Sequence, residues 1–121
     1  MLNHIQKVFR ALAQPTRLKM ALLLANRSLC VCELEDVFQM SQPAISQHMR
    51  VFRDAGLVRE ARQGQWVFYV LNRDHLVEIL QALSDLLDKD PGEIPGLQVE
   101  ADRIRQLEKN PKVNCERPEG L

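Results

Sequence analysis

The chain has 121 residues, of which 45% are hydrophobic and 26% charged, and its formal net charge is zero, as is typical of a soluble globular protein. This length suits one main domain with a modest core. No apolar run approaches the ~20 residues of a transmembrane helix, and the N-terminus lacks the apolar stretch of a secretory signal, so we expect a cytoplasmic protein with no membrane partner.

The charges are unevenly distributed along the chain. Residues 1–28 carry five basic side chains and no acidic ones, whereas residues 74–110 carry nine acidic and four basic side chains. A basic N-terminal and central region beside an acidic C-terminal part favours a local contact with DNA over general attraction to polyanions. The alternative is ordinary solvated surface charge.

The apolar spacing predicts four helices in the first half of the chain. A first helix should end before Gln14, and Pro15 suits the first turn of a second. A short third helix is predicted across Glu33–Phe38. Ser41 can cap a fourth, which should run to about Asp54. The third and fourth helices have the order of a helix-turn-helix, which reads DNA with its second helix.

The predicted fourth helix has one apolar and one polar face. Ile45, Met49 and Phe52 recur at helical spacing and should be buried. His48 lies near that buried side, so we expect a packed, hydrogen-bonded histidine rather than a metal ligand. Glutamine and arginine suit base edges in the major groove. The residues predicted to contact DNA from this segment are polar and face outwards: Ser41, Gln42, Ser46, Gln47 and Arg50.

Beyond the fourth helix the pattern changes to that of a hairpin. Leu57–Arg62 and Trp66–Leu71 are rich in β-formers and flank a short connection centred on a glycine. Helices followed by such a hairpin predict a mainly α fold with a small β-hairpin, the winged helix-turn-helix. Arg59 and Arg62 in the wing, and Arg17 near the second helix, are predicted to contact phosphates.

The C-terminal third begins with an apolar-rich helix predicted at about Asp74–Asp88. Its apolar band is broad for the terminal helix of a small domain, which indicates a partner subunit and hence a dimer. Two Pro-Gly pairs then break the chain before a polar helix at about 97–109. We therefore predict a DNA-binding and dimerisation domain over residues 1–90, and a C-terminal extension with a short helix and flexible tail over 91–121.

The chain has three cysteines. An odd number of cysteines in a reducing compartment does not indicate a disulfide framework. Cys30 and Cys32 lie one residue apart beside a helix start, and thiolates prefer soft ions. Side chains at i and i+2 of a helix point about 200° apart, so both can hold one ion only if Cys30 precedes the helix or ligation unwinds its first turn. The helix N-terminus is expected to lower the thiol pKa, against repulsion from nearby carboxylates.

Five segments together resemble the ArsR/SmtB family over about residues 3–88. The resemblance implies a dimeric winged helix-turn-helix repressor that binds double-stranded operator DNA without a cofactor and leaves it on binding a metal or metalloid. The segments that carry it are Ala11–Leu18, Leu29–Leu34, Ser41–Met49, Ala55–Val58 and Gly64–Tyr69.

The Leu-Cys-Val-Cys-Glu-Leu stretch at residues 29–34 is similar to the arsenic-responsive branch of that family, whose inducers are trivalent arsenic and antimony. Its best-known members carry a third cysteine three residues after the second, where this chain has Glu35. Cys115 in the tail is the only other thiol. It is either a third ligand, from its own subunit or the partner, or an exposed cysteine without function. The candidate ligands are therefore Cys30, Cys32 and Cys115.

Other functions are weighed against the same residues. Zinc-sensing members of the family place Asp and His ligands along the fifth helix, and only Asp74 and His75 stand at its start here. A cadmium or lead sensor, or a repressor switched by oxidation of the cysteine pair, remains an alternative. An enzyme is not expected, because neither a CxxC pair nor a cysteine followed six residues later by arginine occurs.

Overall fold

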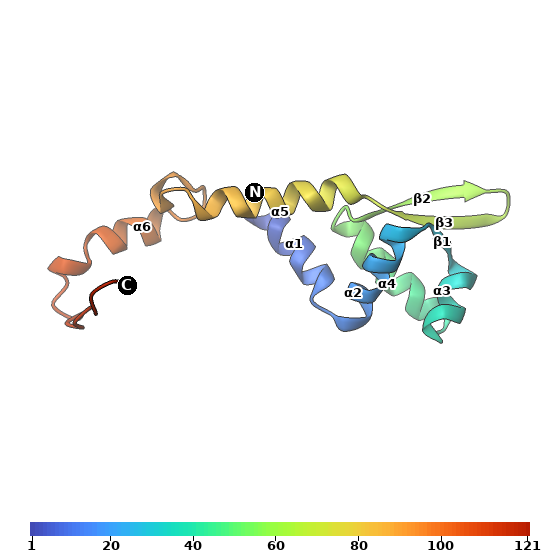
Figure 1. Ribbon diagram of the computed structural model, residues 1–121, viewed down its shortest axis with the longest axis horizontal. Coiled ribbons are helices and arrows are strands. Elements are labelled where there is room, and N and C mark those ends of the chain that lie inside the picture. The colour runs from blue at the N-terminus through green and yellow to red at the C-terminus, as the bar shows by residue number, and fades with distance from the viewer. The chain divides into compact units, whose positions relative to one another are not determined.

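The computed structural model describes residues 1–121 and divides them into two compact units, Met1–Ser84 and Asp85–Leu121. The first unit has the predicted winged helix-turn-helix fold (Figure 1). Its helices α3 and α4 form the helix-turn-helix, and its strands β2 and β3 form the wing. The elements in chain order are α1 (Leu2–Leu12), α2 (Pro15–Asn26), β1 (Leu29–Cys30), α3 (Val31–Phe38), α4 (Gln42–Asp54), β2 (Val58–Gln63), β3 (Trp66–Leu71) and α5 (Arg73–Leu87).

Helices α1 and α2 meet at a tight corner that the sequence predicts. Gln14 caps α2, because its side-chain oxygen accepts a hydrogen bond from the backbone N–H of Arg17 at 2.7 Å. Pro15 occupies the first turn, where a missing N–H does no harm. The buried face of α1 consists of Ile5, Val8 and Ala11.

The turn between α3 and α4 sets the orientation of the exposed face of α4. Gln39 ends α3 in the left-handed conformation, with φ of 53°. Ser41 then caps α4 as predicted, its hydroxyl accepting from the backbone N–H of Ala44 at 3.4 Å. Ile45, Met49 and Phe52 are fully buried, as the apolar spacing predicts.

The wing is a two-stranded hairpin with a third, short strand beside it. Gln63 pairs with Trp66, so the turn contains only two residues, and Gly64 adopts a φ of +60° at its first position. The sequence did not predict strand β1, which pairs antiparallel with β3 and gives the strand order β1-β3-β2. A strand of two residues is too short to show the alternation by which strands are recognised.

The join between α4 and the wing is fixed by contacts with the start of α5. Gly56 ends α4 with a φ of +72°, and its backbone carbonyl accepts a hydrogen bond from the Asn72 side chain at 2.9 Å. A Cβ atom at position 56 would lie 3.2 Å from the ring of His75. On α5 itself, Ile79 is buried whereas Val77 and Leu80 are about half exposed.

The second unit contains the end of α5, a 3₁₀ turn η1 (Pro91–Glu93), α6 (Gln98–Arg105) and a second 3₁₀ turn η2 (Leu107–Lys109). The polar helix predicted at 97–109 is therefore shorter and ends in η2. Ile94 and Ala101 are the buried apolar residues of this unit. The boundary between the units falls within α5, and the functional division after residue 90 stays a prediction. No helix is long and apolar enough to cross a bilayer.

Candidate thiol site and nucleic-acid interface

The outer face of α4 carries an exposed row of polar side chains. Gln42, Gln47 and Arg50 are exposed, and Ser46 is half-buried. The amide of Gln42 donates to the hydroxyl of Ser46 at 2.7 Å, so these two side chains are held together on the first turn. Together with the exposed Ser41, the α4 residues predicted to contact DNA share one accessible face.

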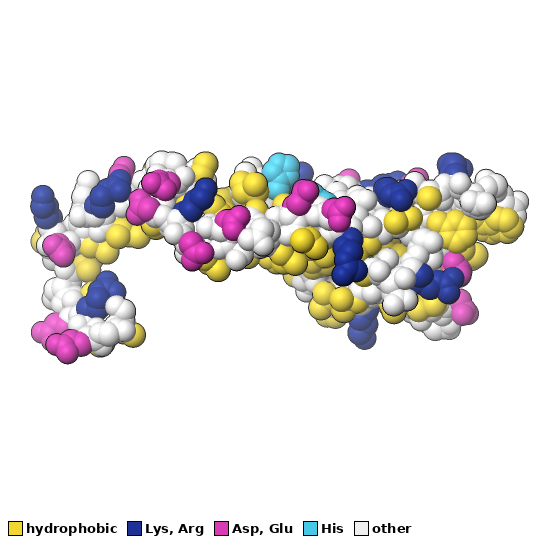
Figure 2. Space-filling view, turned by 45° about the horizontal axis from the view of Figure 1, so that its top comes forward, with side chains coloured by type: hydrophobic (Ala, Val, Ile, Leu, Met, Phe, Trp, Pro, Cys, Tyr) yellow, Lys and Arg dark blue, Asp and Glu magenta, His cyan; other side chains and the backbone are white.

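The wing adds basic side chains to this end of the first unit. Arg59 and Arg62 are exposed on β2. Arg53 at the end of α4 forms an ion pair with Glu60 of β2, which ties the helix to the wing. Figure 2 shows basic side chains over the hairpin and the adjoining helices, and acidic side chains along α5. The basic side chains that the sequence predicts for the wing are therefore exposed.

Arg17 is placed differently from the other predicted DNA contacts. It is half-buried, its Nε donates to the backbone carbonyl of Ala11 at 2.7 Å, and its Nη1 lies 3.3 Å from Nδ1 of His48. Burial, and then the charge of Arg17, lowers the pKa of His48, so the neutral ring accepts this contact. The expected packed, hydrogen-bonded histidine is confirmed. Arg17 thus joins α1, α2 and α4, and its contact with phosphate stays a prediction.

The two cysteines of the CxC pair face one another. Cys30 is the last residue of β1 and the N-cap of α3, with extended backbone, whereas Cys32 lies in the first turn of the helix. Their Sγ atoms are 3.1 Å apart. The sequence allowed both thiols to bind one ion either if Cys30 precedes the helix or if ligation unwinds the first turn. The structure has the first arrangement, with Cys30 before the helix. Sulfur atoms bound to one ion at about 2.3 Å each are separated by roughly 3.3–3.8 Å, so ligation needs only a small adjustment.

Glu33 fixes the backbone of the first cysteine. The Cys30 N–H donates to Oε1 of Glu33 at 3.0 Å, and the Cys30 sulfur faces the Glu33 backbone N–H, which completes a capping box. The second carboxylate oxygen lies 3.4 Å from Nη2 of Arg27. These contacts, first the Cys30 N–H and then the Arg27 charge, hold the pKa of Glu33 below its usual value. Sequence reasoning missed this role, although the spacing of Cys30 and Glu33 is that of a capping box with cysteine at the cap.

The predicted lowering of the thiol pKa is wrong for Cys30. Burial and the hydrogen bond with Cys32 raise the pKa of Cys30, outweighing the opposing effect of the Glu33 backbone N–H. Cys30 is buried, so the cost of a charge away from water exceeds the benefit of the helix terminus. The thiol is therefore protonated at neutral pH, and an ion that binds it must displace the proton.

A hollow of about 350 Å³ opens beside the cysteine pair. It lies where β1, α3, the first turn of α4 and the wing come together. Trp66, half exposed, forms part of its wall, and sequence reasoning missed this residue because the pairing of β1 with the wing could not be seen. The lining residues are Cys30, Val31, Cys32, Glu35, Gln42, Gln65, Trp66 and Val67.

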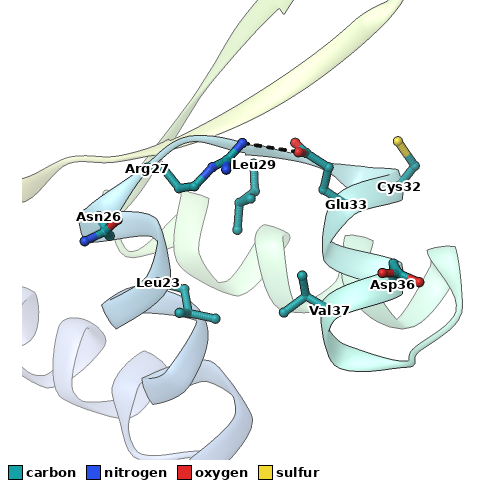
Figure 3. Close-up of a pocket in the computed structure, with 8 residues that line it drawn as sticks. All are labelled: Leu23, Asn26, Arg27, Leu29, Cys32, Glu33, Asp36 and Val37. Carbon is teal, nitrogen blue, oxygen red and sulfur yellow. Dashed lines mark hydrogen bonds and ion pairs between the residues drawn. The ribbon is translucent and has the colours of Figure 1, made fainter.

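A second, larger groove of about 490 Å³ separates α2 from α3 (Figure 3). Leu23 and Val37 face each other across it, and the ion pair of Arg27 with Glu33 crosses its upper edge. Cys32 stands at the rim with its sulfur pointing away from the groove. Cys30 does not line this groove, whereas both cysteines line the hollow beside the wing.

Cys115 belongs to the second unit and is exposed. The structure contains no group of three or more His, Cys, Asp or Glu side chains arranged to hold a metal ion. Within the first unit the site therefore offers two thiols, and a third ligand from Cys115 stays a prediction.

Comparison with known proteins identifies the family. Residues 14–60 match a family described as bacterial regulatory proteins of the arsR family. An uncharacterized HTH-type transcriptional regulator of Methanocaldococcus jannaschii is 38% identical over 81 residues, which cover 66% of this chain and 91% of that protein. The chain belongs to the ArsR family. Its members named here are transcriptional regulators, not enzymes.

Two further similar proteins carry names that mention arsenic or arsenicals. The arsenic resistance transcriptional regulator ArsR1 of Pseudomonas putida is 48% identical over 66 residues, 54% of this chain and 52% of that protein. The match thus spans about half the length of this relative. A crystal structure described as a possible transcriptional regulator for arsenical resistance has a TM-score of 0.57 and 34% identity, covering 80% of this chain and 91% of that one.

Proposed function

We propose that this ArsR-family protein is a homodimeric transcriptional repressor, released from its operator when trivalent arsenic or antimony binds Cys30 and Cys32. The observation that carries the proposal is the pair of Sγ atoms 3.1 Å apart at the junction of the helix-turn-helix and the wing. The names of the relative from Pseudomonas putida and of the matching crystal structure support arsenic as the signal.

DNA binding is supported by the exposed polar face of α4 and the basic wing. In this proposal α4 enters a major groove, where Gln47 and Arg50 read base edges. Arg59 and Arg62 contact phosphates, which fix orientation without reading sequence. Double-stranded operator DNA needs no cofactor for this contact.

Release is supported by the position of Cys30 at the N-cap of α3. Binding an ion replaces the thiol protons and widens the Sγ–Sγ separation from 3.1 Å to roughly 3.3–3.8 Å, which shifts the start of α3 and the end of β1. Helix α3 packs on α4, and β1 pairs with β3 of the wing. The shift is therefore transmitted both to α4 and to the wing, the two elements proposed to contact DNA. By linkage, DNA must weaken ion binding by the same factor.

The dimer is supported by apolar side chains that the first unit leaves exposed. On α5, Val77 and Leu80 are 54% and 47% exposed, and on α1 Phe9 is 36% exposed. A second copy of the chain is the partner that covers these faces in the proposed assembly. Two-fold symmetry then predicts a near-palindromic operator with half-sites about 34 Å apart, one turn of DNA.

The test is operator binding under reducing conditions, with arsenite, antimonite, cadmium and zinc added in turn. We expect arsenite and antimonite to release the wild-type protein. Cys30→Ser and Cys32→Ser should still bind DNA but no longer respond, and serine at position 30 keeps a capping oxygen for α3. Cys115→Ser is the matched control and should still respond. A full response by Cys32→Ser would contradict the proposal, and loss of response in Cys115→Ser would make Cys115 an obligatory ligand.

A redox switch is the second candidate, favoured by the same short Sγ–Sγ distance. The sulfur atoms must close from 3.1 Å to about 2.05 Å to form a disulfide. In that case peroxide alone should release DNA, and dithiothreitol should restore binding. Release by cadmium and not arsenite would instead indicate the cadmium or lead sensor.

A further inference from the structure

We propose that the two-thiol site takes a trivalent arsenical bearing one organic substituent, and that this substituent lies against Trp66 in the hollow beside the wing. This inference rests on the proposed function, in which arsenic binds Cys30 and Cys32. It assigns a specificity-determining role to Trp66 and a chemical class to the inducer.

The ligand count of the site points to an arsenical that needs two thiols. Trivalent arsenic forms three bonds, and the first unit supplies two sulfur atoms within bonding distance of one ion. Glu35 also lines the hollow, but its carboxylate is a hard ligand poorly suited to a soft ion. An arsenical of the form R–As(OH)₂ already carries its third bond, to carbon.

The binding step balances without any oxidant or reductant. Each As–OH bond is replaced by an As–S bond, and each thiol proton leaves with the hydroxide as water. One arsenical and two thiols therefore give one R–As(S)₂ adduct and two water molecules. Arsenic stays trivalent throughout, and the organic group R remains attached and must be accommodated beside the sulfur atoms.

The strand register places Trp66 to receive this group. Cys30 pairs with Phe68 across β1 and β3. Side chains alternate along a strand, so Trp66 lies on the same face of β3 as Phe68, one step further towards Cys32. Both cysteines and Trp66 line the same hollow of about 350 Å³, with Val67 beside them.

Trp66 presents apolar surface that nothing in the first unit covers. Half of the Trp66 surface is exposed. Figure 2 shows a patch of hydrophobic side chains where the hairpin lies, at the right of the view. A methyl or phenyl group on arsenic would remove this surface from water, whereas the hydroxyl of inorganic arsenite would not. The organic arsenical therefore gains affinity from the indole that arsenite lacks.

The experiment compares arsenite, methylarsonous acid and phenylarsonous acid as agents that release labelled operator DNA. It uses the wild type, Trp66→Ala and, as matched control, Trp66→Phe, which keeps an aromatic face. In the wild type each organic arsenical should act at a lower concentration than arsenite. For each organic arsenical we take the ratio of the arsenite concentration to the organic arsenical concentration that releases half of the DNA. Trp66→Ala should reduce this ratio about tenfold for the phenyl compound, because losing most of an aromatic contact is worth roughly one decade in affinity. Trp66→Phe should keep most of the preference for the phenyl compound over arsenite.

The outcomes separate this inference from the proposed function. An unchanged ratio in Trp66→Ala, with arsenite still active, would overturn the role of Trp66 alone. Trp66 is the only tryptophan, so its fluorescence reports wild-type binding without DNA. Failure of all three compounds to change that fluorescence or to release DNA would overturn both proposals. Circular dichroism of Trp66→Ala checks that the variant is folded, as expected for a half-exposed side chain.

Discussion

Cys30 pairs with Phe68 across two antiparallel strands, so the first thiol of the site belongs to the same hydrogen-bonded ladder as the wing. The next residue begins α3, which packs on α4. A displacement of Cys30 therefore reaches the wing through β3 and the recognition helix through α3. The sequence around the CxC pair suggests only the second route.

Substitutions in α4 and the wing should separate two kinds of DNA contact. Gln47→Ala should reduce the preference for operator over random DNA, since a base-edge contact provides roughly 1–3 kcal/mol of discrimination. Arg62→Ala should weaken binding to both DNAs and reduce the slope of log affinity against log salt by about one unit. Fluorescence anisotropy over a range of salt concentrations measures both effects. A change of sequence preference in Arg62→Ala alone would reverse the assignment of helix and wing.

A charge on the exposed apolar face of α5 should disrupt the dimer. Leu80→Lys places an ammonium group among apolar side chains and should raise the dimer dissociation constant at least about tenfold, because an unpaired buried charge is costly. Glu78→Lys is the matched control, since position 78 lies on the polar side of the same helix. Sedimentation equilibrium at micromolar concentration measures the change. Equal dimer dissociation constants for the two variants would show that the apolar face of α5 does not form the dimer interface.

Two glycines with positive φ should tolerate alanine unequally. Gly64→Ala should cost about 1 kcal/mol of unfolding free energy, because a Cβ in the left-handed region is strained but meets no atom within 4 Å. Gly56→Ala has a similar φ and also brings a Cβ to 3.2 Å from the His75 ring, so we expect it to cost at least about 1 kcal/mol more. Urea denaturation of both variants tests this. Equal losses would mean that the His75 ring moves aside freely.

The lowered pKa of His48 predicts a loss of stability in mild acid. Its folded pKa lies below the unfolded value near 6.5, so the unfolded chain binds more protons as the pH falls through this range. The stabilisation is complete above about pH 6.5 and is lost as pH falls towards the folded pKa. Urea midpoints between pH 7.5 and 5 should fall more steeply for the wild type than for His48→Gln, which cannot titrate. Parallel curves would contradict the shift.

The helices and the wing could be predicted because each carries its own local signal. Ile45, Met49 and Phe52 repeat at helical spacing, and Pro15 and Ser41 mark helix starts in the sequence itself. The wing follows from two β-rich runs around Gly64. These signals depend on neighbours within a few residues, so the sequence displays them directly.

The environment of the thiol pair could be predicted only in part. The CxC spacing identified Cys30 and Cys32, but the approach of Trp66 depends on pairing between segments more than thirty residues apart. The pKa of Cys30 was predicted from the helix terminus, a local effect, and burial reversed its direction. Long-range pairing and burial are properties of the folded chain, which is why the motif did not reveal them.

The two free edges of the small sheet are poor templates for another strand. One edge is β1, which offers only two residues before the chain turns into a helix. The other is β2, where Arg59, Glu60 and Arg62 are exposed. Short or charged edges discourage intermolecular strand addition. A concentrated solution of this protein should therefore resist aggregation through its wing, which leaves the hairpin free for the phosphate contacts proposed for Arg59 and Arg62.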